Sequence, residues 1–188
     1  LAVAAIDTAL WDIRGKQTGL PLWKLAGGSS DRVPLYDTEG GWLHISAEEL
    51  VSGAVASHKK GWPGVKLKIG KPDPLEDFDR LQAVREAVGP SMHIMVDANQ
   101  SMTLAQAVQR SQLLEPLGLF WIEEPMPADH IWEHGKLAEK TTIPVAVGES
   151  IYSAAIFQQY LHQGGAGVVQ VDVARVGGIT PWLKVAHL

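Results

Sequence analysis

The 188-residue chain contains no cysteine, so it has neither a disulfide framework nor a thiol nucleophile. A chain without cysteine fits the cytoplasm, which is where we expect this protein to act. Basic residues are also few: the net charge is −5 and the longest basic run is Lys59-Lys60, so a nucleic-acid partner is not expected. The composition therefore excludes disulfide-stabilised domains and thiol-dependent enzymes, and an anionic substrate would need locally concentrated positive charge.

The sequence also lacks a long apolar run. Its opening segment, LAVAAIDTALWDIRGK, is apolar on one helical face, but Asp7 and Asp12 interrupt it and no basic leader precedes it. The segment is neither a signal peptide nor a membrane span, and its spacing predicts an amphipathic helix that ends near Gly15. With 46% hydrophobic and 20% charged residues, the chain has the composition of an ordinary soluble globular protein, and no membrane partner is expected.

Five short apolar runs that end in charged side chains organise the remainder of the chain. VKLKI carries Lys66 and Lys68, and HIMVD, LFWIEE, PVAVGE and VVQVD end in Asp97, Glu123 with Glu124, Glu149 and Asp172. From Asp97 onward the run ends recur at intervals of 26, 26 and 23 residues with helical patterns between them, which is typical of βα units in a parallel sheet. Together with VPLYDT, which precedes them, they predict six βα units.

Two architectures can be built from such units. A doubly wound open sheet can close with six strands, whereas a (β/α)8 TIM-type barrel needs eight strands and typically about 250 residues. The charged side chains all follow the ends of their strands, and such a rim favours the barrel. The sequence therefore predicts an α/β fold, a partial TIM-type barrel of about six βα units, and we expect its C-terminal strands to be missing from this chain.

The two lysines of VKLKI point to one face of their strand, because they are two residues apart. Val65, Leu67 and Ile69 point to the other face, where helices would pack, so Lys66 and Lys68 are expected to face the barrel interior. A polar edge strand is the alternative. Repulsion between the two ammonium groups, together with a nearby metal ion, would lower the pKa of both lysines toward a range that suits proton abstraction.

The acidic strand ends predict a metal site. Asp97, Glu123 and Glu149 supply three hard oxygen ligands, and no histidine or cysteine lies beside them, so the set suits Mg²⁺ better than zinc. Each residue alone could instead cap the helix that follows it. Glu124 points away from Glu123 and is expected to have a structural partner, although alternation alone does not decide which of the two is the ligand.

Two more polar residues follow strand ends. Asn99 could bind a substrate hydroxyl or could simply be a turn residue. Asp172 could cap a helix or, beside a histidine, orient its imidazole ring. None of the seven histidines follows a strand end, so a catalytic histidine is expected beyond residue 188.

The motifs KLK, VDANQ, WIEEP, VGE and VDVARVGG, in this order and spacing, resemble the mandelate racemase/muconate lactonizing enzyme-like branch of the enolase superfamily. The resemblance covers nearly the whole chain. It implies that residues 1–30 are the end of an N-terminal α+β capping domain and a linker, and that residues 31–188 belong to the barrel domain.

The resemblance also implies roles for the charged residues. Asp97, Glu123 and Glu149 would bind Mg²⁺, which stabilises an enediolate in this superfamily. Lys68 would be the catalytic base on one face of the substrate, and Lys66 would neutralise the substrate carboxylate. Asp172 would pair with a histidine on a seventh strand outside the chain.

Within this branch, YDTEGGWLH and GVKLKIGKP are similar to galactarate/talarate dehydratase-like acid-sugar dehydratases. The similarity implies a hydro-lyase that removes the proton α to the carboxylate of an aldarate or aldonate and then expels the β-hydroxyl. Its partners would be a small sugar acid and further copies of itself in a homo-oligomer. Two alternatives remain: a racemase or epimerase of a 2-hydroxy acid on the same scaffold, and a catalytically silent barrel that binds or scaffolds.

Overall fold

The computed structural model describes residues 1–188 and contains one five-stranded parallel sheet in which neighbouring strands follow one another in the sequence. The strands are β1 (Gly64–Lys68), β2 (His93–Asp97), β3 (Trp121–Glu123), β4 (Val145–Val147) and β5 (Val168–Val169). The helices are α1 (Ala2–Thr18), α2 (Leu22–Leu25), α3 (Ala47–Lys59), α4 (Pro74–Val88), α5 (Leu104–Leu114), α6 (Ile131–Ala138), α7 (Ala154–His162), α8 (Ile179–Ala186) and the 3₁₀ helix η1 (Glu115–Leu117). Each pair of consecutive strands is connected through a helix, as predicted.

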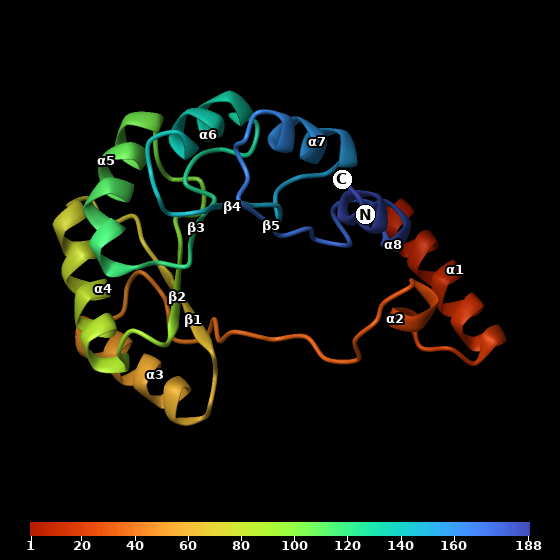
Figure 1. Ribbon diagram of the computed structural model, residues 1–188, viewed down its shortest axis with the longest axis horizontal. Helices are drawn as coiled ribbons and strands as arrows, with labels where there is room; N and C mark the ends of the chain where they lie inside the picture. Colours follow the sequence, from red (N-terminus) through yellow and green to blue (C-terminus); the bar gives the residue numbers. More distant parts are fainter.

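The helices cover only one face of the sheet. In Figure 1, α3 to α7 follow the outside of a curved row of strands, and α1, α2 and α8 lie together at the far end of a long connection. A doubly wound sheet has helices on both faces, whereas a barrel has them only outside. The prediction of a partial barrel is therefore confirmed.

The first predicted strand, VPLYDT, is reduced to a single bridge between Asp37 and Val65. The backbone N–H of Asp37 donates to the carbonyl oxygen of Gly64 and its carbonyl accepts from Lys66, and both bonds are 2.9 Å long. Five of the six predicted segments therefore contribute a strand to the sheet, and VPLYDT, the first of them, contributes only this bridge beside β1.

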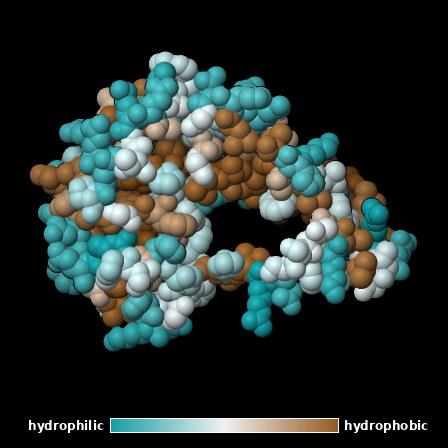
Figure 2. All heavy atoms as spheres, viewed as in Figure 1, coloured by the Kyte–Doolittle hydropathy of each residue, from teal (hydrophilic) through white to brown (hydrophobic).

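Side chains of the strands alternate between two apolar layers. The outer layer packs under the helices and includes Val65, Leu67, Ile94 and Ile122 among 28 buried residues. The inner layer is small: Met95, Trp121 and Ala146 lie on the concave face. Figure 2 shows apolar atoms gathered beside the opening that the arc encloses, over the region of β4, β5 and α7. The outer layer is thus the main hydrophobic core, and the concave face is left for polar groups.

Side-chain caps fix the starts of several helices. Ser46 and Thr103 each form a capping box, and Asp73 accepts a hydrogen bond from the N–H of Leu75 at 2.9 Å. Helix α1 continues past Gly15, where its end was predicted, and stops at Thr18. None of the helices combines the length and the apolar composition that crossing a bilayer requires.

The loop before α3 approaches β1 so closely that only glycine fits. The carbonyl of Gly41 accepts a 2.7 Å hydrogen bond from the N–H of Lys68, and a Cβ on Gly41 would lie 2.3 Å from the carbonyl oxygen of Lys66. Gly53 in α3 is the opposite case, because a Cβ there would meet no atom within 4 Å.

We therefore expect opposite effects from alanine at these two glycines. Gly41→Ala should lower the free energy of unfolding by about 2 kcal/mol, because backbone atoms have to move. Gly53→Ala should raise it by up to about 1 kcal/mol, because alanine favours the helix. Thermal unfolding of both variants of the whole protein measures this, and equal stability of Gly41→Ala and the unaltered protein would contradict the close approach.

Candidate active site

Two lysines project from β1 onto the acidic ends of β2 and β3. Lys66 Nζ lies 2.7 Å from Glu123 Oε1 and 3.5 Å from Asp97 Oδ2. Lys68 Nζ lies 2.6 Å from Asp97 Oδ2 and 2.6 Å from Asn99 Oδ1. Both lysines lie on the concave face, as the alternation predicted. β1 is the terminal strand of the sheet, but its two lysines contact the buried acids Asp97 and Glu123 rather than solvent alone.

Strand register brings the acids together. Lys68 pairs with Asp97, and Asp97 pairs in turn with Glu123, so the three residues form a row across β1, β2 and β3. Asp97 is 1% exposed and Glu123 3% exposed. Glu149 follows β4 at the same end of the sheet and is partly buried. The carboxyl ends of parallel strands thus form one rim of alternating charge.

The carboxylates of this rim interact electrostatically. Burial raises the pKa of Glu149, and the negative charges of Glu124 and Asp97 raise it further. A carboxyl group whose pKa is raised by its acidic neighbours lies where negative charge exceeds positive charge. A cation bound beside Glu149 would relieve that excess.

Without the metal ion that the prediction assumed, the pKa of Lys66 is raised. Burial by itself lowers the pKa of Lys66, but the hydrogen bond to Glu123 and the attraction of Glu123 and Asp97 outweigh burial. The pKa of Lys66 therefore stands above its ordinary value. Lys66 is held as a cation.

Asp97, Glu123 and Glu149 offer carboxylate oxygens, which are the ligands that a hard divalent cation prefers. No three His, Cys, Asp or Glu side chains are grouped closely enough to hold one ion as they stand, because the lysine ammonium groups contact the oxygens of Asp97 and Glu123. The assignment of Asp97, Glu123 and Glu149 as metal ligands stays a prediction.

Asn99 and Asp172 both make local turn contacts. Asn99 has φ 44°, its N–H donates to Asp97 Oδ1 at 2.9 Å, and its side-chain oxygen accepts from Lys68. Asp172 Oδ1 accepts from the N–H groups of Ala174 and Arg175 at 2.8 Å. No histidine contacts Asp172, which nevertheless lines a cavity of about 840 Å³ on the concave face with Lys66, Glu123 and Glu149.

Sequence reasoning missed several residues that support the rim. Glu123 Oε2 accepts from Gln170 at 3.0 Å and from the indole N–H of Trp121 at 3.3 Å. Gln170 directly follows β5 and lies two residues before Asp172, so alternation along the predicted strand VVQVD could have identified it.

Glu124 has the structural partner that was predicted. Its Oε2 accepts from Gln100 at 3.1 Å, and Gln100 also donates to Ser150 Oγ at 2.8 Å. Glu124 has φ 39° and Gln100 has φ 62°, which is uncommon for residues other than glycine and frequent at functional sites. A second, strained polar network thus lies behind the rim.

Lysines and carboxylates lie at the carboxyl ends of the strands of this (β/α)-barrel segment. This arrangement is typical of barrel enzymes whose charged rim can bind a metal ion. Comparison with known families identifies the superfamily to which the chain belongs. Residues 49–188 match the model of the "Enolase C-terminal domain-like" family, and residues 1–27 match that of the "Mandelate racemase / muconate lactonizing enzyme, N-terminal domain". The chain belongs to the enolase superfamily.

The chain is similar to two named dehydratases. The chain is 42% identical to L-talarate/galactarate dehydratase of Salmonella typhimurium and 36% identical to arabinonate dehydratase of Saccharolobus solfataricus. These matches cover 100% and 99% of the chain but 47% and 50% of the relatives. The chain thus spans about half the length of the relatives it matches.

Solved structures agree with this grouping. L-Talarate dehydratase from Polaromonas sp. JS666, complexed with Mg and L-glucarate, superposes with a TM-score of 0.94 at 42% identity, over 99% of this chain and 52% of that one. A racemase from Streptomyces coelicolor with bound magnesium superposes with a TM-score of 0.94 at 35% identity, over 99% and 52%. The fold of the chain is that of these enzymes.

The ion pairs of the rim predict a stability effect. Lys66→Met should lower the free energy of unfolding by about 3 kcal/mol when no divalent ion is present, because Glu123 loses the cation it contacts in a buried position. Lys59→Met, at an exposed position of α3, is the control and should change little. Denaturant unfolding measures both, and an unchanged midpoint for Lys66→Met would show that the pair does not stabilise the rim.

Proposed function

We propose that the whole protein is an Mg²⁺-dependent acid-sugar dehydratase that removes the proton α to a carboxylate. The observation that carries this proposal is the pair of inward-pointing lysines in contact with Asp97 and Glu123. The similarity to dehydratases of talarate, galactarate and arabinonate supports both the reaction and the class of substrate. We further propose that residues 1–30 belong to the capping domain and residues 31–188 to the barrel.

Asp97, Glu123 and Glu149 would hold the Mg²⁺ ion. The raised pKa of Glu149 supports this assignment, because burial and the nearby charges of Glu124 and Asp97 both disfavour its charged form, and a bound cation would offset both effects. The bound ion would supply charge neutralisation at the substrate carboxylate, which makes the neighbouring C–H bond more acidic.

The two lysines would have different roles. Lys66, whose pKa is raised, would stay protonated and balance the charge of the substrate carboxylate. Lys68 would take the α-proton onto Nζ. The side-chain oxygen Oδ1 of Asn99 accepts a hydrogen bond from Lys68, and it would either orient that nitrogen or bind a substrate hydroxyl. Preorganised charges of this kind stabilise negative charge as it develops in the transition state.

The reaction balances without an external oxidant or reductant. The electron pair of the broken C–H bond forms the new double bond, and the β-hydroxyl leaves as water with a proton from an acid. The enol product then tautomerises to a 2-keto-3-deoxy sugar acid. Asp172 would orient the acid, a histidine supplied from outside residues 1–188.

A racemase or epimerase is the second candidate, because the magnesium-bound racemase from Streptomyces coelicolor has the same fold. It would use the same base and return the proton to the opposite face of the α-carbon. A catalytically silent scaffold is disfavoured, since burying two lysines and two acids costs stability unless the group has a use.

Removing one acidic ligand tests the metal assignment. Glu149→Gln should weaken Mg²⁺ binding by more than about 100-fold and abolish activity, because the neutral amide is a poorer ligand for a hard cation. Glu86→Gln on the exposed side of α4 is the control. Calorimetric titration with Mg²⁺ measures the affinity, and unaltered binding by Glu149→Gln would remove Glu149 from the ligand set.

Removing the amine of Lys68 tests the reaction itself. Lys68→Met keeps much of the apolar stem, so galactarate should still bind in the presence of Mg²⁺, while dehydration falls by about 100-fold to 10,000-fold. In deuterated water the variant should also fail to exchange the α-proton of any substrate processed from that face.

Lys184→Met, at an exposed position of α8, is the matched control for this experiment. Full activity of Lys68→Met would exclude Lys68 as the base. An epimer formed by the unaltered protein, with no dehydrated product, would favour the racemase instead.

A further inference from the structure

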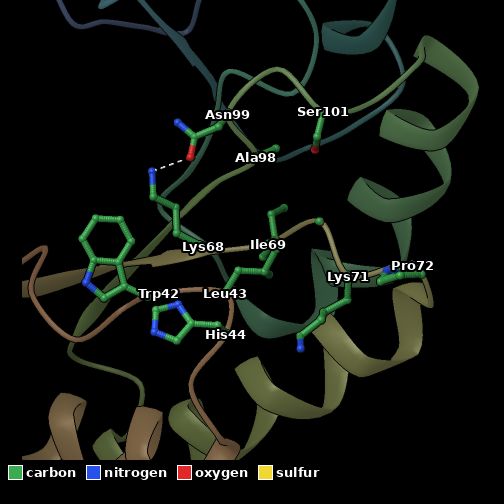
Figure 3. A pocket seen from close by; sticks show the side chains of 11 residues that line it. Trp42, Leu43, His44, Lys68, Ile69, Lys71, Pro72, Ala98, Asn99 and Ser101 are labelled. Atoms are coloured by element: carbon green, nitrogen blue, oxygen red, sulfur yellow. Dashed lines mark hydrogen bonds between the residues drawn. The ribbon is translucent and has the colours of Figure 1, made fainter.

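A second polar cavity opens beside the candidate base. It has a volume of about 580 Å³, and its walls include Trp42, His44, Lys68, Lys71, Asn99 and Ser101. Figure 3 shows Lys68 and Asn99 pointing toward each other at one end of this space and His44 and Lys71 at the other, with Leu43 and Ile69 between them. The cavity therefore reaches from the proposed reaction centre to the loop after β1.

The charges around this cavity have one sign. Two lysines and a histidine line it and no Asp or Glu does, although the whole chain carries a net charge of −5. Lys68 already contacts Asp97, but the ammonium of Lys71 makes no hydrogen bond, and its nearest acid is the exposed Glu76 at 4.0 Å. Such a contact is weak in water, so Lys71 is available to an anion.

A buried ion pair fixes the backbone of Lys71. Asp77 is fully buried and accepts hydrogen bonds from the N–H of Gly70 at 2.8 Å and of Lys71 at 3.2 Å. Arg110 pairs with Asp77 and also donates to the carbonyl of Lys71 at 2.8 Å. Hydrogen bonds thus fix both the N–H and the carbonyl group of Lys71.

The same buried cluster fixes the opposite wall. Arg80 lies 3.7 Å from Asp77 and donates to the carbonyl of Trp42 at 3.1 Å and to that of Lys68 at 3.4 Å. Trp42 itself is 51% exposed, so its ring offers an apolar wall beside the polar groups. The reaction centre and Lys71 are therefore held at a fixed separation by one set of buried charges, which is the kind of support that precise binding needs.

We propose that this cavity binds the distal carboxylate of a dicarboxylic sugar acid and that Lys71 is the residue that selects a diacid over a monoacid. The inference rests on the proposed function. With the reacting carboxylate beside Lys66 and the α-carbon beside Lys68, the far end of the carbon chain extends into this cavity. There Lys71 supplies the charge, His44 and Ser101 supply hydrogen-bonding groups, and Trp42 covers the C–H side of the chain.

The test compares two substrates that differ at the far end only: galactarate, with a distal carboxylate, and galactonate, with a distal hydroxymethyl group. In the whole protein, Lys71→Met should lower kcat/KM for galactarate by about tenfold, mainly through KM, because a partly exposed ion pair is lost. The value for galactonate should stay unchanged. Lys71→Arg should restore much of the loss, and Lys140→Met, at an exposed position, should have no effect.

Calorimetric binding of both sugar acids gives a readout that does not depend on turnover. Lys71→Met should weaken galactarate binding by about tenfold and leave galactonate binding unchanged. An equal change for both ligands, or none, would overturn the role of Lys71 while leaving the dehydratase proposal intact. Absence of turnover with either sugar acid would instead contradict the dehydratase proposal, and the binding comparison would still decide the role of Lys71.

Discussion

The structure depends on the alternation of side chains along β1. Val65 and Leu67 enter the main core under the helices, and this placement forces Lys66 and Lys68 onto the concave face. Ammonium groups in that position are costly unless acids pair with them, and Asp97 and Glu123 meet this need from the two neighbouring strands. The chemistry proposed for the rim is thus a consequence of how the outer core is filled.

A second set of buried charges works on the other side of the sheet. Asp77, Arg80 and Arg110 lie on helices α4 and α5, and each contacts the backbone of the loops around the rim. Their side chains carry no proposed catalytic role. They hold Trp42, Lys68 and Lys71 in place, so the outer helices determine the shape of the cavity on the inner side. Packing and specificity are connected in this way.

Much of this arrangement followed from the sequence. The strand ends and the inward lysines depend on local alternation, which a sequence displays directly. The pairing of Asp77 with Arg110 depends on how two helices pack, and no local pattern in the chain marks it. The raised pKa of Lys66 in the metal-free site could not be predicted, because its contact with Glu123 depends on strand register and rotamer. For the same reason the role of Lys71 became apparent only in the structure.

The central claim is that the lysines and acids of the rim form one site for Mg²⁺ and a sugar carboxylate. A crystal structure of the whole protein with Mg²⁺ and an unreactive analogue of a sugar diacid tests it most directly. The account predicts the ion between Asp97, Glu123 and Glu149, and the analogue carboxylate beside Lys66. An ion bound elsewhere, or an analogue whose carboxylate lies away from Lys66, would contradict it.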